Sequence, residues 1–198
     1  MSNALPFDFS RCHNHYLVMR HGHSQANAMG LIVSSPQEGI AGYGLSPKGH
    51  EQLARRLDEW HLAPPTHLLH SDFLRTTETA AHVAAHFGLT ARAELRLRER
   101  FFGNFDLGPD HAYAAVWAED ASDASHQGGG VESVRAVAER LTRLIEDLEN
   151  ELDGATILLV GHGDPLQILL TAAAGRDLAH HRDQIALVPA DVKPLVMS

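Results

Sequence analysis

Apolar and polar positions alternate along the chain in the manner of strands and helices taken in turn. Short apolar runs at 16–20, 66–71 and 155–160 have the length of buried strands. Between them lie longer segments whose apolar residues recur three and four positions apart, which is the spacing of amphipathic helices. The alternation predicts an α/β fold of three layers, α/β/α, with a mostly parallel central sheet.

Residues that favour helix starts mark where the expected helices begin. Ser46 and Pro47 suit the N-cap and the first helical position, so they predict a helix that follows them. Asp164 and Pro165 predict the same two positions for a helix after the third apolar run. Residues 134–152 carry the strongest amphipathic pattern of the chain, which predicts a long helix packed on the sheet.

Another helix is expected between Asp72 and Gly88, because glycine readily adopts the conformation that ends a helix. Arg75 falls in its first turn, where a cation opposes the helix dipole. Taken alone, this arginine is equally well explained as a solvated surface residue or as a phosphate ligand. The apolar face of this helix is expected to consist of Leu74, Ala81, Ala84 and Phe87.

Weaker patterns complete the expected fold. Residues 94–99 alternate as a strand does, and Glu99 shares the parity of the leucines, so its carboxylate is expected to point from the apolar side into a cavity. Taken alone, however, a glutamate is more often found on the protein surface than in a cavity. Residues 103–130 are expected to form a flexible connection with a short helix near 113–119, residues 30–44 a loop, and residues 185–188 an edge strand.

Length and charge limit the kind of protein. A chain of 198 residues suits one domain over 1–198, with residues 1–14 as a tail or lead-in to the first strand. The formal net charge of -9 disfavours nucleic acid and anionic membranes as partners. Without a secretory leader, a membrane-length apolar run or a second cysteine beside Cys12, a cytoplasmic location is expected.

Histidine is unusually frequent, with 15 residues, so metal binding has to be weighed. His21 and His23 at the end of a strand form a plausible metal pair, as in a metal-dependent hydrolase. Arg20 argues against it, because a fixed cation beside a dication is electrostatically costly. We expect most of the other histidines to be solvated, and we expect neither a metal nor another cofactor.

Several chemically competent side chains are expected at one edge of the sheet. Buried runs end in Arg20-His21 and in His162, and ligands bind at the carboxyl ends of parallel strands. Arginine binds phosphate bidentately, neutral histidine is a nucleophile, and a carboxylic acid such as Glu99 can protonate a leaving oxygen. The residues therefore indicate phosphoryl transfer, although they do not distinguish His21 from His162 as the nucleophile.

At this point the chain resembles a known family. Residues 17–27, with Arg20, His21, Gly22, Ser24 and Asn27, are similar to the Arg-His-Gly-x-Ser/Thr-x-x-Asn signature of the histidine phosphatase superfamily, also called phosphoglycerate mutase-like. Four further blocks of that family have counterparts in the same order, at 44–52, 71–80, 97–103 and 160–163. Five ordered blocks make chance a poor explanation.

The resemblance implies a role for each matched residue. His21 would be the phosphorylated nucleophile and Glu99 the proton donor. The phosphoryl group would be surrounded by Arg20, Arg75 and His162, with auxiliary contacts from Asn27 and Ser24. The implied reaction is hydrolysis of a small phosphorylated substrate through phosphohistidine, without a metal.

The chain also departs from the family pattern. His23 stands where relatives often have Glu or Gln, Asp72 replaces a frequent proline, and Asp106 replaces a frequent glutamate. These changes bear on substrate identity more than on the reaction. Residues 103–131 are shorter than the insertion of true mutases, so hydrolysis is favoured over mutase activity; a catalytically silent binding member of the fold is the remaining alternative. Nothing in the sequence names the substrate or the oligomeric state.

Overall fold

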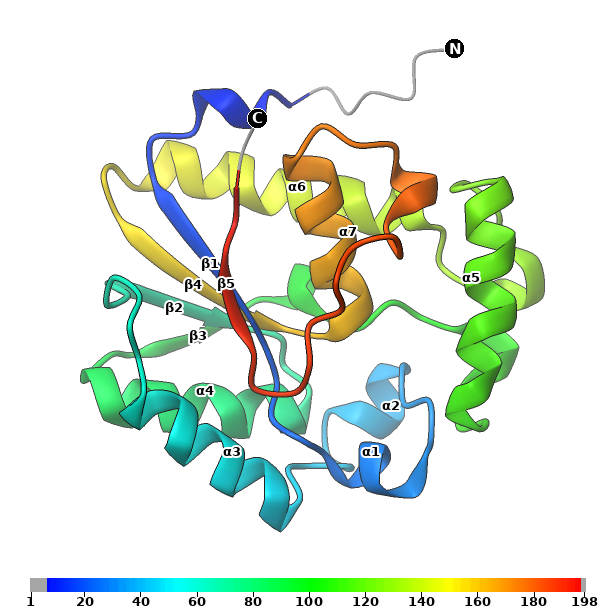
Figure 1. Cartoon of the computed structure of the whole chain (residues 1–198), viewed down its shortest axis with the longest axis horizontal. Coiled ribbons are helices and arrows are strands. Elements are labelled where there is room, and N and C mark those ends of the chain that lie inside the picture. The colour runs from blue at the N-terminus through cyan, green and yellow to red at the C-terminus, as the bar shows by residue number, and fades with distance from the viewer. Residues whose placement is uncertain (1–6, 197–198) are drawn as a thin grey trace.

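A five-stranded sheet forms the centre of the computed structural model, which describes residues 7–196 (Figure 1). Its strand order is β3-β2-β4-β1-β5. Four of these strands run parallel, and β5 pairs with β1 in the antiparallel direction. The strands span β1 (His15–Arg20), β2 (His67–His70), β3 (Ala91–Ala93), β4 (Thr156–Gly161) and β5 (Val192–Pro194).

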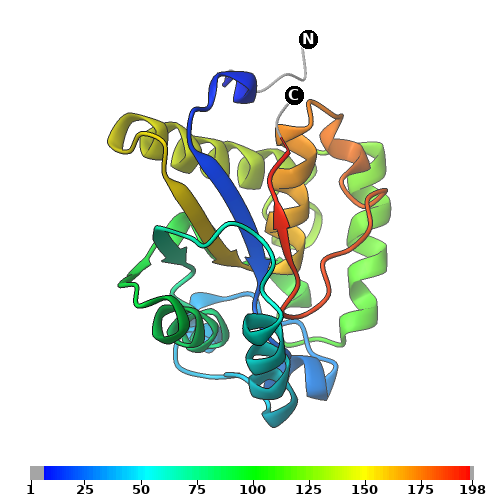
Figure 2. The ribbon, with the colours of Figure 1, turned by 60° about the vertical axis from the view of Figure 1, so that its left-hand side comes forward.

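Helices cover both faces of this sheet, so the predicted three-layer fold is confirmed (Figures 1 and 2). One face packs on α3 (Pro47–Asp58) and α4 (Leu74–Phe87), the other on α6 (Val134–Glu151) and α7 (Gly163–Ala173). The remaining helices are α1 (Gln25–Met29), α2 (Pro36–Gly39) and α5 (Tyr113–Ser122). Among residues 7–196, no helix is both long enough and apolar enough to cross a membrane.

Side chains of β1 show why the sheet needs cover on both sides. Val18 packs in the core beneath α6 and α7, whereas Leu17 and Met19 pack in the core beneath α3 and α4. Successive residues of a strand point to opposite faces, so a continuous apolar run such as 16–19 fits only a sheet that is buried twice. The helices that the sequence predicts at 47, 74 and 134 supply that cover.

The carboxyl ends of β1 and β4 lie side by side and bring two histidines together. Arg20 pairs with Gly161 in the register of these strands, and the amide of His21 donates to the carbonyl of Gly161 at 3.0 Å. His162 follows directly as the N-cap of α7. The register of β1 and β4 therefore brings Arg20, His21 and His162 to one edge of the sheet, where the sequence predicts the site.

The prediction of a strand at 94–99 is wrong. The chain leaves β3 at Ala93 and forms a 3₁₀ turn over Leu95–Leu97, because the Glu94 carboxylate accepts hydrogen bonds from both the backbone and the side chain of Arg96. Leu95 is exposed while Leu97 is buried, so the two leucines do not share a face. Glu99 reaches the pocket from a loop and not through strand parity.

The expected apolar face of α4 is confirmed only in part. Ala84 and Phe87 are half-buried and pack against the core, whereas Ala81 is exposed and Leu74 is only half-buried. The helix instead buries a face that mixes polar and apolar residues, namely Arg75, Thr76, Thr79, Ala80 and Val83. Hydrogen bonds within the site fix this rotation, since Thr79 Oγ1 accepts from the amide of Gly22 at 3.1 Å.

Four smaller expectations need correction. His162 and not Asp164 is the N-cap of α7, because the helix begins at Gly163. The edge strand is Val192–Pro194 and not 185–188, since the backbone of β1 pairs with the later segment. Within 30–44 the chain forms α2, and 103–130 contains 3₁₀ turns besides α5, whose position near 113–119 was predicted. Residues 1–6 of the expected lead-in lie outside the described residues, and Phe9 within its remainder is buried in the core.

Candidate active site

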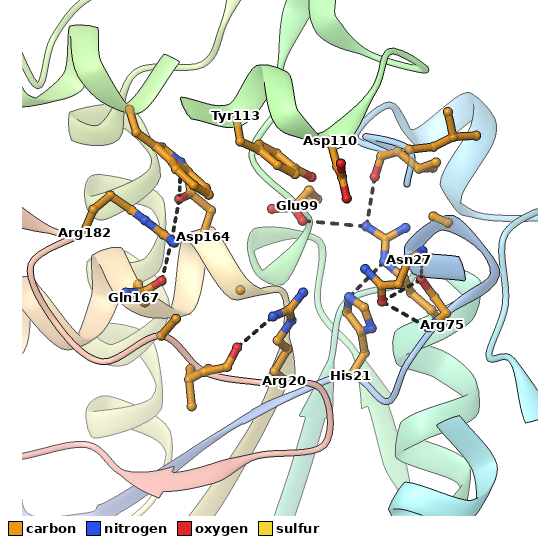
Figure 3. A pocket seen from close by; sticks show the side chains of 18 residues that line it. Arg20, His21, Asn27, Arg75, Glu99, Asp110, Tyr113, Asp164, Gln167 and Arg182 are labelled. Atoms are coloured by element: carbon orange, nitrogen blue, oxygen red, sulfur yellow. Dashed lines mark hydrogen bonds and ion pairs between the residues drawn. The ribbon is translucent and has the colours of Figure 1, made fainter. Parts of the chain in front are cut away.

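His21 is a buried, neutral histidine at the end of β1. Its Nδ1 lies 2.7 Å from the carbonyl oxygen of Gly22, which can only accept, so Nδ1 carries the proton and Nε2 carries a lone pair. Nε2 accepts a hydrogen bond from Arg75 Nε at 3.2 Å (Figure 3). Burial, with Arg75 and Arg20 nearby, lowers the pKa of His21 well below its ordinary value. The imidazole is therefore neutral, and a neutral imidazole with a lone pair on Nε2 is chemically able to act as a nucleophile.

Arg75 enters the pocket from the first turn of α4 and is 3% exposed, so the surface interpretation of this residue is wrong. Its Nη2 donates to the carbonyl of Val33 at 2.9 Å and lies 3.7 Å from Glu99 Oε2. Its Nη1 is buried without a hydrogen-bond partner. The Nε and Nη2 atoms of Arg75 are therefore held by hydrogen bonds within the protein, and its Nη1 atom has none.

Arg20 and His162 also lie near His21, and each has one buried guanidinium or ring nitrogen without a hydrogen-bond partner among residues 7–196; His162 is not among the residues that line the pocket. Arg20 Nη1 donates to the carbonyl of Leu187 at 2.7 Å, and its Nε is buried without a partner. His162 is fully buried, with Nε2 2.9 Å from Ser71 Oγ and Nδ1 without a hydrogen-bond partner. Burial, together with Arg75, lowers the pKa of His162 well below its ordinary value.

These nitrogens without partners form a site suited to an anion. Buried polar groups in proteins are nearly always hydrogen-bonded, because leaving one unpaired costs about 1–3 kcal/mol. Arg20 Nε, Arg75 Nη1 and His162 Nδ1 are unpaired within one site, and two of the three belong to permanent cations. A tetrahedral anion such as a phosphoryl group, with several acceptor oxygens, would satisfy groups of this kind together.

Glu99 lines the same pocket, and its pKa is shifted toward neutrality. Its side chain is 9% exposed, and its Oε2 lies 3.7 Å from His162 Nδ1. Burial raises the pKa of Glu99 to about 7, although Arg75 opposes the shift. A carboxyl group with that pKa is present as acid and as base at neutral pH, which is the range that general acid and base catalysis requires.

Asn27 and Ser24 also line the pocket. They form a capping box at the start of α1, in which Asn27 Oδ1 accepts from the amide and the hydroxyl of Ser24, both at 3.0 Å. This pairing leaves the amide nitrogen of Asn27 as the group that can serve a ligand. Ser24 acts here as the residue that orients Asn27.

The three residues that depart from the family pattern each form hydrogen bonds with other parts of the chain. His23 Nδ1 lies 2.7 Å from Ser46 Oγ, Asp72 binds Arg98 bidentately at 2.8 and 2.6 Å, and Asp106 accepts from the backbone of Ser34 at 2.7 Å. Of these, none lines the pocket that contains His21.

The geometry gives no support to a metal pair at His21 and His23. The guanidinium of Arg75, a permanent cation, lies 3.2 Å from His21 Nε2, where it would repel a metal ion, and His23 is oriented toward Ser46. Within residues 7–196, no three histidine, cysteine or acidic side chains are grouped as metal ligands.

The pocket extends well beyond the residues that the sequence singled out. It is a cavity of about 340 Å³, and Figure 3 shows Arg182, Gln167 and Asp164 grouped at one side, away from Arg75 and Asn27. Sequence reasoning missed these residues as functional candidates, and also Tyr113 and Trp117 of α5. For Arg182 no signal existed, since residues 176–198 carry little periodicity.

Comparison with known proteins gives consistent matches. The family model described as histidine phosphatase superfamily (branch 1) matches residues 16–195. The chain is 30% identical over 172 residues to a glucosyl-3-phosphoglycerate phosphatase of Mycobacterium tuberculosis, covering 79% of this chain and 73% of the relative. It is 27% identical over 165 residues to a probable phosphoglycerate mutase, GpmB, of Salmonella typhi, covering 81% and 74%.

Solved structures share the fold. A structure described as mycobacterial hydrolase 1 superposes with a TM-score of 0.77 at 25% identity, covering 91% of this chain and 88% of the other. Phosphoserine phosphatase of Entamoeba histolytica, solved with 3-phosphoglyceric acid, superposes with a TM-score of 0.72 at 17% identity, covering 91% and 89%. At that identity the likeness concerns the fold alone.

Proposed function

The chain belongs to the histidine phosphatase superfamily, and we propose that it is a phosphomonoester hydrolase in which His21 carries the phosphoryl group. The observation that carries the proposal is the set of buried nitrogens without hydrogen-bond partners on Arg20, Arg75 and His162, around a neutral histidine. In this arrangement the cations bind the phosphoryl oxygens while the imidazole lone pair reaches phosphorus. The negative charge of the phosphoryl group is balanced by the positive charges of Arg20 and Arg75.

In the first step, Nε2 of His21 attacks phosphorus and the bond from phosphorus to the ester oxygen breaks. Protonated Glu99 gives its proton to that departing oxygen, so the alcohol leaves neutral. The hydrogen bond from Nδ1 to the Gly22 carbonyl stabilises the positive charge that develops on the imidazole ring. Arg20, Arg75 and His162 hold the equatorial oxygens as the charge redistributes.

In the second step, water attacks phosphorus from the side the alcohol has left. Glu99, now ionised, accepts a proton from that water, and the bond between phosphorus and His21 breaks. Inorganic phosphate is released, and both His21 and Glu99 return to their starting protonation states. A pKa of about 7 suits Glu99 for both roles, because neither protonation state is strongly disfavoured.

The substrate we propose is a small phosphorylated molecule. The cavity of about 340 Å³ lies at the low end of the range for small-molecule sites, about 300–1,000 Å³. The named relatives include a glucosyl-3-phosphoglycerate phosphatase, which agrees with a small phosphorylated substrate. Release of inorganic phosphate distinguishes hydrolysis from mutase activity, and turnover itself distinguishes an enzyme from a silent binding protein.

The test compares two neighbouring histidines. His21→Ala should lower kcat/KM for a phosphomonoester such as p-nitrophenyl phosphate by at least about a thousandfold, because it removes the nucleophile. His23→Ala is the matched control, since its ring packs on Ser46 and does not line the pocket; it should stay within about threefold of the unaltered enzyme. Phosphate release is measured for both, and substantial hydrolysis by His21→Ala would overturn the proposal.

A further inference from the structure

The loop that carries Glu99 has no regular secondary structure of its own to hold it. Residues 98–101 form neither helix nor strand, and the chain is next paired at Phe102, where an isolated bridge joins it to Val131. A helix or strand is fixed by its own backbone hydrogen bonds, whereas a loop depends on contacts from elsewhere in the fold. The position of the Glu99 carboxyl group therefore depends on the side chains that bind this loop.

Arg140, in the first half of α6, binds the backbone of this loop at three places. Its Nη2 donates to the carbonyl oxygen of Arg98 at 3.0 Å and to that of Glu99 at 3.3 Å. Its Nη1 donates to the carbonyl oxygen of Arg96. One guanidinium group therefore holds the chain both just before Glu99 and at Glu99 itself.

Glu132 keeps Arg140 in the orientation that these contacts need. Arg140 Nε lies 2.9 Å from Glu132 Oε1, and its Nη2 lies 3.1 Å from Oε2, so the two side chains form a bidentate ion pair. The backbone of Glu132 binds the far end of the same loop, since its amide donates to the carbonyl of Phe101 at 2.8 Å and its carbonyl accepts from Arg100 Nε at 2.7 Å. The ion pair and the loop therefore form one connected unit.

A single peptide group links Arg140 to the carboxyl group of Glu99. The carbonyl of this peptide belongs to Glu99 and accepts from Arg140 Nη2, while its amide belongs to Arg100 and donates to Glu99 Oε1 at 3.0 Å. Because a peptide group is planar, its carbonyl and its amide turn together. The hydrogen bond to Arg140 thus fixes the amide that orients the carboxyl group.

The other carboxyl oxygen of Glu99 faces the reacting groups. Oε2 lies 3.7 Å from Arg75 Nη2 and 3.7 Å from His162 Nδ1, whereas Oε1 is bound to the backbone. Oε2 is therefore the oxygen placed to carry a proton to a departing group. A misplacement of about 1 Å at such a group can lower the rate about a hundredfold.

We propose that Arg140 is a positioning residue for the general acid: it holds the peptide after Glu99 so that Oε2 faces the ester oxygen that leaves. Arg140 does not line the pocket and does not touch the substrate. The proposal rests on the proposed phosphatase activity and adds to it a residue outside the pocket. It concerns proton donation and not the binding of the phosphoryl group, so its loss should affect some esters far more than others.

The test uses two aryl esters that differ in their need for a proton. Nitrophenolate is stable enough to leave p-nitrophenyl phosphate without protonation, whereas the more basic oxygen of phenyl phosphate needs a general acid. We expect Arg140→Met to lower kcat/KM for phenyl phosphate by about tenfold to a hundredfold, and that for p-nitrophenyl phosphate by less than about threefold. A merely structural loss, such as a smaller folded fraction, would lower both values equally.

Arg143→Met is the matched control, because Arg143 is exposed on the same helix and makes none of the hydrogen bonds that hold this loop among residues 7–196. It should leave the ratio of the two kcat/KM values unchanged. Arg140→Lys keeps the charge but loses the planar fork, so its ratio should fall between those of the unaltered enzyme and Arg140→Met. If Arg140→Met does not fold, the lysine variant decides the test, and an unchanged ratio in it would overturn the proposal.

A double substitution shows whether Arg140 acts through Glu99. In Glu99→Gln the proton donor is already lost, so adding Arg140→Met should leave the ratio where Glu99→Gln alone puts it. A ratio that Arg140→Met alone does not change, or that falls as far again in the Glu99→Gln background, would overturn the positioning role while leaving the proposed function intact. An unaltered enzyme that does not hydrolyse p-nitrophenyl phosphate would instead overturn the proposed function, and this proposal with it.

Discussion

At the scale of single residues, the account depends on two buried groups that are neutral for the same reason. Burial raises the pKa of Glu99 to about 7 and lowers that of His21 well below 6.5, since in both cases a low-dielectric site disfavours the charged form. An acid and a nucleophile are therefore ready together at neutral pH. Arginines beside them reinforce the shift of His21 and limit that of Glu99.

The pH dependence of kcat/KM follows from these shifts. The first step needs protonated Glu99, so for an alkyl phosphate kcat/KM should be level just below pH 7 and fall about tenfold per pH unit above it. Lowering the pH should not remove activity until His21 is protonated, well below pH 6.5. A pH–rate profile checks this, and Glu99→Gln should lack the alkaline limb; an identical limb in that variant would assign it to another group.

Sequence reasoning reached most of the residues at the phosphoryl end of the pocket, because they follow strands or open helices. Arg20, His21 and His162 lie at strand ends that register brings together. Arg75 could not be distinguished from other arginines by its own segment, since its burial depends on the rotation of α4. Arg182 was missed because its place in the pocket depends on contacts with Trp117, Asp164 and Gln167, which the sequence pattern does not reveal.

At the scale of elements, the site depends on how closely α3 approaches the loop after β1. Ser46, the N-cap of α3, donates its amide to the carbonyl of His23 at 2.9 Å. Gly49 in the first turn sits so near that a Cβ atom would lie 2.1 Å from the same oxygen. Because the obstacle is backbone, no side-chain rotation can relieve it.

Gly49→Ala should therefore destabilise the protein. Overpacking costs about 1–3 kcal/mol, which exceeds the gain of up to about 1 kcal/mol that alanine brings to a helix. Urea unfolding should show a lower midpoint, and kcat/KM should fall as the loop that carries His21 moves. Gly128→Ala is the control, since the nearest atom to its Cβ would be 3.5 Å away; equal midpoints for the two variants would contradict the close approach.

Helices and strands whose apolar residues recur at regular spacing were predicted from the sequence. Elements whose conformation depends on side-chain hydrogen bonds were not. The long helix at 134 and the strands before His21 and His162 follow from apolar spacing. The segment 94–99 alternates like a strand, yet Glu94 binds the backbone amide of Arg96 and turns the chain into a 3₁₀ turn. Local bonds of this kind compete with strand pairing and leave no trace in apolar periodicity.

At the scale of the whole molecule, the reaction needs four separate segments in one place. Arg20 ends β1 and His21 follows it, and Arg75 lies in the first turn of α4. Glu99 lies in the loop after the 3₁₀ turn, and His162 is the N-cap of α7. The chain as a whole carries a formal charge of -9, whereas this site concentrates arginines. The pocket therefore has a local positive field that the net charge of the chain does not reveal.

The central claim, that the phosphoryl group passes through His21, is tested most directly by trapping it. In Glu99→Gln with p-nitrophenyl phosphate, nitrophenolate leaves without a proton, whereas water attack lacks its base. The account predicts a burst of nitrophenolate approaching one per chain and phosphate bound to His21, detected by mass spectrometry after rapid quenching. Phosphate on another residue, or no burst and no modification of His21 while the unaltered enzyme turns over, would contradict it.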